Sequence, residues 1–158
     1  MHGGGQERGL RPGTLPIPNI VGFGKACNIS KKNMEKEHVE ISRLRDKLLS
    51  SIQNEISDCT INGNLEKRLA GNLNLCFNNI NNEALIASMP SVAFSSGAAC
   101  ASSKMEASHV LLALGLSKKE AFSSIRFGIG RFNVENEIEE VTKKLKSNIQ
   151  KLRNQTFL

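Results

Sequence analysis

The sequence lacks the features that mark exported, metal-binding and membrane proteins. No apolar run approaches the roughly 20 residues that a membrane helix needs, and no apolar stretch follows the polar, glycine-rich start as it would in a signal peptide. The cysteines form no C-x-x-C pair and have no histidine pair nearby, which argues against a zinc site and a secreted disulfide framework; they are Cys27, Cys59, Cys76 and Cys100. We expect a cytoplasmic protein with no bound metal and no membrane span.

Acidic residues are too few to balance the basic ones, and the formal net charge is +6. Such a surplus can indicate nucleic-acid binding, because cationic side chains release counterions from phosphates. Here, however, the basic residues concentrate in the second half of one amphipathic segment, with no aromatic residue among them to stack on bases; they are Lys143, Lys144, Lys146, Lys151 and Arg153. We predict a solvated helix face and no direct nucleic-acid binding.

The hydrophobic pattern predicts one domain-sized chain of mixed helices and strands. Helices are expected at residues 19–30, 33–57, 107–114, 117–122 and 133–152, with another short one before Pro90, and strands at 72–77, 92–94 and 124–130. In the first strand Leu73, Leu75 and Phe77 should point inward and Cys76 outward. The first helix should be mostly buried, with Cys27 in the core. The order predicts an α/β or α+β fold with a small, mainly antiparallel sheet packed by helices.

Small residues surround Cys100 on both sides, from Ser95 to Ser103. They leave the backbone free and put nothing bulky beside the sulfur, so an accessible and reactive thiol is one interpretation. A buried cysteine in a tight connection is the alternative, because free cysteines are among the most buried residue types.

Two further groups of residues are unusual for their surroundings. The glycine-rich start contains Arg8, Arg11 and Thr14, which together could cradle a phosphate; a flexible linker or an expression scar is the alternative. Arg126 is a single charge inside an otherwise uncharged strand.

Three stretches together resemble one known family, and the resemblance extends over essentially the whole chain. They are residues 2–16 (HGGGQERGLRPGTLP), 95–100 (SSGAAC) and 123–132 (SSIRFGIGRF). In order and spacing they are similar to the C-terminal part of bacterial cysteine desulfurases, pyridoxal-phosphate enzymes of the class V aminotransferase group. The resemblance implies the small domain of a fold-type I enzyme at residues 34–158, preceded at 1–33 by the end of the large cofactor-binding domain.

The resemblance also implies roles for individual residues. Cys100 matches the nucleophile that takes sulfur from L-cysteine as a persulfide while alanine is released. Arg126 matches the arginine that holds the substrate carboxylate, and Thr14 the threonine that reaches the cofactor phosphate of the partner subunit, in a turn shaped by Arg11 and Gly13. The implied partners are L-cysteine, a second copy in a homodimer, and sulfur-acceptor proteins such as the iron–sulfur scaffold protein or those that serve tRNA thiolation.

The chain departs from the family pattern in three places. It has no His-Lys pair, so the lysine that carries pyridoxal 5'-phosphate is absent, and we expect the cofactor only in the complete enzyme and no activity from this chain alone. It also ends before the usual scaffold-binding tail, and Ala107 stands where the family often has proline. Met1 is interpreted as an internal or disrupted-gene start, or as a fragment boundary. The alternatives are a non-catalytic persulfide carrier or interaction module, and the inactive product of a broken gene.

Overall fold

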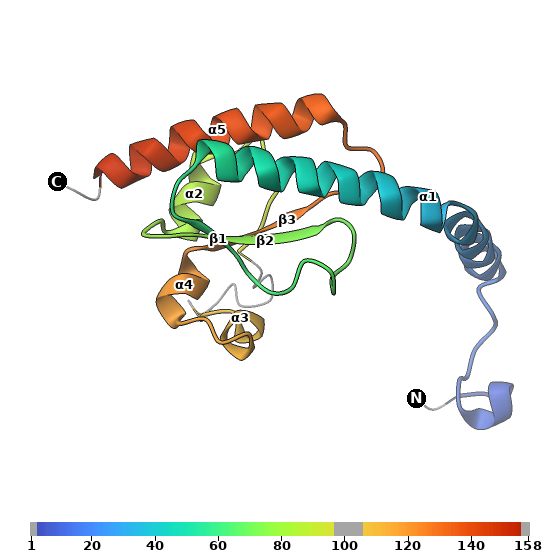
Figure 1. Ribbon diagram of the computed structural model, residues 1–158. Helices are drawn as coiled ribbons and strands as arrows, with labels where there is room; N and C mark the ends of the chain where they lie inside the picture. The colour runs from blue at the N-terminus through green and yellow to red at the C-terminus, as the bar shows by residue number, and fades with distance from the viewer. Residues whose placement is uncertain (1–2, 97–105, 156–158) are drawn as a thin grey trace. The chain divides into compact units, whose positions relative to one another are not determined.

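The computed structural model describes residues 3–96 and 106–155, and the chain forms two compact units, Met1–Lys36 and Glu37–Leu158 (Figure 1). The first unit contains a short 3-10 helix, η1 (Gln6–Gly9), and the first part of a long helix, α1 (Ile17–Glu55). None of its described residues is buried.

The prediction of two separate helices at 19–30 and 33–57 was wrong, because α1 is continuous from Ile17 to Glu55. Nothing between residues 25 and 55 is a proline or a glycine, so no residue there ends the helix. The expected burial of its beginning was also wrong: Cys27 is exposed, because nothing within this unit packs against the helix.

The second unit is built on a three-stranded antiparallel sheet in the order β1-β2-β3, formed by β1 (Cys59–Ile61), β2 (Asn72–Phe77) and β3 (Ser124–Gly128). The strands predicted at 72–77 and 124–130 are confirmed, whereas β1 was not predicted. The strand predicted at 92–94 is absent from the described structure: Val92 donates to the carbonyl of Met89 in a turn, and only Ser95 forms a bridge, to Arg126.

One face of this sheet carries the hydrophobic core. Leu73, Leu75 and Phe77 of β2 are fully buried there, as predicted. They pack against α1 from Glu37 onward, α2 (Asn82–Ser88) and α5 (Glu135–Gln155), whose core residues are Leu44, Leu48, Ile52, Leu85, Leu145 and Ile149. Figure 1 shows α1 and α5 side by side over the sheet, and ion pairs such as Lys47 to Glu139 at 3.1 Å join them. None of the helices in the described part of the chain is both long and apolar enough to cross a membrane.

Among the residues that the structure describes, helices cover only part of the other face. There α3 (His109–Ala113) and α4 (Lys118–Phe122) lie against the sheet, and α4 starts with a capping box between Ser117 and Glu120. Cys76 leaves the core face, as predicted, but it does not reach solvent: its side chain lies 3.5 Å from the carbonyl of Glu120 and is 1% exposed.

We expect Gly71→Ala to destabilise the protein, because a Cβ at this position would lie 1.9 Å from the carbonyl oxygen of Ile129. The carbonyl of Gly71 accepts a 2.8 Å hydrogen bond from the backbone N–H of Ile129, so the two backbones cannot separate without losing this bond. Overpacking of this kind costs about 1–3 kcal/mol. Urea denaturation followed by circular dichroism measures it. Gly128→Ala is the matched control, since no atom lies within 4 Å of the added Cβ; equal losses in both variants would contradict the close approach.

We expect the purified chain to self-associate through the exposed apolar side chains of the first unit. Ile20, Val21 and Phe23 are 48%, 65% and 74% exposed, and contiguous apolar surface of this kind drives association in water. Size-exclusion chromatography with light scattering should show species larger than a monomer, and Val21→Ser with Phe23→Ser should reduce them. A monodisperse monomer of the wild-type chain would contradict this expectation.

Candidate functional site

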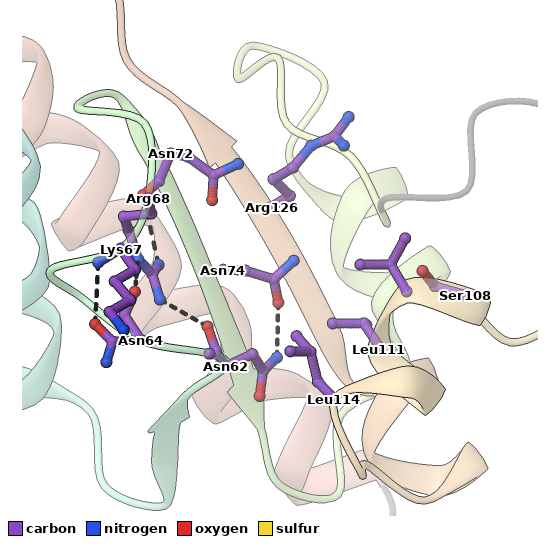
Figure 2. Close-up of a pocket in the computed structure, with 12 residues that line it drawn as sticks. Asn62, Asn64, Lys67, Arg68, Asn72, Asn74, Ser108, Leu111, Leu114 and Arg126 are labelled. Carbon is purple, nitrogen blue, oxygen red and sulfur yellow. Dashed lines mark hydrogen bonds between the residues drawn. The ribbon is translucent and has the colours of Figure 1, made fainter.

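An open pocket of about 270 Å³ lies between the polar face of the sheet and α3 (Figure 2). We call it the arginine pocket and define it by six of its lining residues, Asn62, Asn72, Asn74, Leu111, Leu114 and Arg126. Figure 2 shows Asn72 and Asn74 projecting from β2, Arg126 from β3, and the two leucines facing them from the α3 side.

The alternation of β3 places Arg126 in this pocket. Ile125 and Phe127 point into the core, so the residue between them must point to the opposite face. The backbone of Arg126 is held by Ser95, with N···O distances of 2.7 and 3.2 Å. Its side chain is exposed, and within residues 3–96 and 106–155 the guanidinium has no hydrogen-bond or ion-pair partner. Arg126 therefore offers a planar cation, unpaired among the described residues, that can hold a carboxylate by two hydrogen bonds.

Arg68 lines the same pocket, but its guanidinium donates hydrogen bonds to backbone carbonyls of the protein. Its Nε donates to the carbonyl of Asn64 at 2.7 Å and its Nη2 to that of Asn62 at 2.8 Å. Burial lowers the pKa of the Arg68 guanidinium, and the charge of Arg45 adds to this effect. These bonds fix the turn around Gly63, whose φ of +78° favours glycine. Arg68 therefore shapes the wall of the pocket.

The floor of the pocket is a network of side-chain amides. Asn62 is 6% exposed, and its Nδ2 donates to Asn74 Oδ1 at 2.6 Å and to Ser124 Oγ at 2.9 Å. Ser124 in turn donates to the carbonyl of Glu120 at 2.7 Å. We did not identify Asn62, Asn74 or Arg68 from the sequence. The repeated asparagines on the polar face of β2 were the available signal, because half-buried amides require partners.

The glycine-rich turn of the first unit is organised by its own side chains. Gln6 Oε1 accepts from the backbone N–H of Gly13 at 3.1 Å, and Arg11 Nη1 donates to the carbonyl of Gly13 at 2.8 Å. Gly13 has a φ of +103°, which favours glycine. Thr14 follows it with an exposed side chain, and its hydroxyl has no partner among the residues that the structure describes.

The thiols of the described chain differ from one another in their surroundings. Burial raises the pKa of Cys59 to about 12, with a smaller contribution from Cys76. Burial likewise raises the pKa of Cys76. Both are thus held as neutral thiols, while Cys27 is exposed. Cys100, the candidate nucleophile, lies outside the described residues.

Neither a metal site nor a complete cofactor site is formed by the described residues. They contain no cluster of His, Cys, Asp or Glu that could hold a metal ion. The arginine pocket does not fit pyridoxal phosphate by itself, because no residue lining it is a carboxylate that could face a ring nitrogen or an aromatic that could stack on the ring. Lys67 lies in its lining but follows Glu66 and not a histidine.

Relatives of known name match almost the whole chain. The "Cysteine desulfurase IscS" of Methylobacillus flagellatus is 51% identical over 97% of this chain and 38% of its own length. That of Rickettsia bellii is 47% identical over 98% of this chain and 38% of its own length. The chain thus spans less than two fifths of the length of these relatives.

Solved structures agree with the fold. A NifS-like protein superposes with a TM-score of 0.81 at 31% identity, over 96% of this chain and 39% of its own. A NifS-like protein from Rickettsia africae gives a TM-score of 0.81 at 26% identity, over 95% of this chain and 39% of its own. A structure of SspA in complex with cysteine has a TM-score of 0.51 at 30% identity, over 85% of this chain and 36% of its own.

These similarities confirm the resemblance to cysteine desulfurases and the predicted fold class, a small antiparallel sheet packed by helices. The family described as aminotransferase class-V matches residues 3–141, which is most of the sequence. The chain therefore belongs to the class V aminotransferase family.

Proposed function

We propose that this chain is the C-terminal part of a cysteine desulfurase, in which Arg126 binds the substrate carboxylate and Cys100 receives the substrate sulfur. The observation that carries the proposal is the unpaired guanidinium of Arg126 over an open pocket, in a strand that has no other charge. A charge so placed has no structural partner among the described residues, and an anionic ligand would supply one.

The covalent chain links the two proposed groups. Arg126 bridges to Ser95, and Cys100 follows Ser95 by five residues. Five residues span at most about 18 Å when fully extended. This connection supports a thiol that serves a substrate held at Arg126.

The proposed reaction balances without an added oxidant. The thiol of Cys100 and L-cysteine give a Cys100 persulfide and L-alanine: the substrate carbon–sulfur bond breaks, a sulfur–sulfur bond forms, and one thiol proton ends on the methyl group of alanine. Pyridoxal phosphate supplies the electron sink for such chemistry in the complete enzyme. This chain contributes the carboxylate contact and the acceptor thiol.

The remaining assignments follow the family. We propose that residues 1–33 end the large domain and that residues 34–158 form the small domain. Thr14, after the turn shaped by Arg11 and Gly13, would reach the cofactor phosphate of a partner subunit in a homodimer. The persulfide would pass to a sulfur acceptor such as an iron–sulfur scaffold protein or an acceptor that serves tRNA thiolation, in the cytoplasm.

We expect a persulfide probe to label Cys100 selectively after exposure of the chain to a low-molecular-weight persulfide donor. Cys59 should stay unlabelled at pH 8, because a pKa of about 12 leaves roughly one thiol in ten thousand ionised. Its reactivity should rise only as the pH approaches that value. Mass spectrometry of a Cys27→Ser background, which removes the exposed thiol, measures the label. Equal labelling of Cys59, Cys76 and Cys100, or undiminished labelling after Cys100→Ser, would refute the assignment.

We expect no alanine from the chain alone, and alanine release once it is combined with the N-terminal part of a relative that supplies the cofactor lysine. In that combined enzyme Arg126→Ala should raise the KM for L-cysteine roughly 10- to 100-fold, as removal of a charged hydrogen bond does, and Arg126→Lys should recover part of it. Arg131→Ala is the matched control, because Arg131 is paired with Glu37 at 3.2 Å. Alanine release by the chain alone would contradict the expectation that it is inactive without the cofactor lysine. An unchanged KM in Arg126→Ala would contradict the carboxylate contact.

A further inference from the structure

Asn74 is the cross-strand neighbour of Arg126 in the β2–β3 register. Residues directly opposite each other in an antiparallel pair project from the same face, close enough for their side chains to meet one ligand. Figure 2 shows both side chains on the pocket side of the sheet. The position two residues further along β3 is Gly128, which has no side chain to fill the space beside Arg126.

The hydrogen-bond network fixes which end of the Asn74 amide faces the pocket. A backbone carbonyl can only accept, so Ser124 uses its single hydroxyl proton on the carbonyl of Glu120. Ser124 Oγ must then accept from Asn62, and only the Nδ2 end of that amide can donate. The same Nδ2 group donates its second proton to Asn74 Oδ1.

The opposite orientation of Asn62 would be unfavourable. It would turn the Asn62 oxygen toward Ser124 Oγ, whose proton is already used, and leave two buried oxygens without a proton between them. Because the orientation of the Asn62 amide is fixed, the side-chain oxygen of Asn74 must face the network and its Nδ2 group must point away from it. No acceptor for this Nδ2 group is found within residues 3–96 and 106–155.

The charges around the pocket favour an anion at this point. Its lining contains the cations Lys67, Arg68 and Arg126 and no Asp or Glu. Of the two arginines, Arg68 is used by backbone carbonyls. Among the described residues, the guanidinium of Arg126 and the Nδ2 group of Asn74 are donors without a partner that stand directly opposite each other on adjacent strands; Lys67 and Asn72 add further donors to the lining.

We propose that Asn74 is a second substrate-binding residue, whose Nδ2 group donates to the same carboxylate that Arg126 holds. This inference rests on the proposed carboxylate contact of Arg126. A carboxylate has two acceptor oxygens, so one donor from each strand would set its rotation as well as its position. Asn62 and Ser124 are positioning residues, which act by fixing the donor end of Asn74.

The test is the affinity of the whole chain for L-alanine and L-cysteine, measured by ligand-observed saturation-transfer NMR, which detects weak ligands of large or self-associated proteins. Asn74→Asp keeps the oxygen that accepts from Asn62 and replaces only the outward donor with a negative oxygen. Asn78→Asp is the matched control, because it adds the same charge four residues further along, outside the lining of the arginine pocket, and keeps the side-chain oxygen that accepts from Cys76. Cysteamine, which has the amine and thiol but no carboxylate, is the control ligand.

We expect Asn74→Asp and Arg126→Ala each to weaken L-alanine binding about tenfold or more, the effect of losing a hydrogen bond to a charged group. Asn78→Asp should weaken it less than about threefold, in line with a screened charge, and cysteamine should not distinguish Asn74→Asp from the wild type. Asn74→Ala, which removes donor and acceptor together, should also weaken binding and serves if Asn74→Asp does not fold.

Equal effects of Asn74→Asp and Asn78→Asp would overturn the role of Asn74 and leave that of Arg126 intact. Unchanged binding in Arg126→Ala would overturn both the carboxylate contact and this inference. Absence of saturation transfer from the wild-type chain to L-alanine would overturn the two-donor site. The Cys100 assignment would still rest on its own labelling result.

Discussion

The register between β2 and β3 determines both the core and the candidate site of the second unit. Leu73 pairs with Phe127 and Leu75 with Ile125 on the core face, while Asn74 pairs with Arg126 on the other. Because side chains alternate along a strand, a slip of one residue would bury Arg126 and expose the core residues. The close approach of Gly71 to Ile129 at the end of the same pair opposes such a slip. The hydrophobic effect that builds the core therefore also places the free guanidinium.

The two faces of the sheet differ in how completely helices cover them. The core face is closed by α1, α2 and α5. On the other face α4 covers the end that contains Cys76 and Ser124, which are buried, whereas Arg126 is exposed with respect to the described residues. The same partial cover suppresses the reactivity of Cys76 and preserves access to the arginine pocket. The buried end also orients the Asn74 amide. Ser124 donates to a backbone carbonyl and accepts from Asn62, and the same Asn62 amide group donates to the side-chain oxygen of Asn74.

Local patterns were enough to predict the strands and helices in which hydrophobic residues alternate with polar ones or recur at helical spacing. Residues 72–77 and the helix at 133–152 were found, and Arg126 was conspicuous as a charge within an apolar strand. The sequence could not show that α4 covers Cys76, since that depends on a contact between residues more than 40 positions apart. β1 has only three residues, too few for a period to be visible. The amide network joins Asn62 to Ser124 across 62 positions and has no local signature. The roles of Cys100, Thr14 and Arg126 come from the family resemblance and remain proposals.

The central claim is that the free cation on β3 is a receptor for the carboxylate of an amino acid. The most direct measurement is a crystal structure of the chain combined with the N-terminal part of a relative and soaked with L-alanine. We expect the alanine carboxylate within hydrogen-bond distance of the Arg126 guanidinium, on the face of the sheet that carries Asn74. A carboxylate bound elsewhere, with Arg126 paired to a protein carboxylate, would contradict the claim.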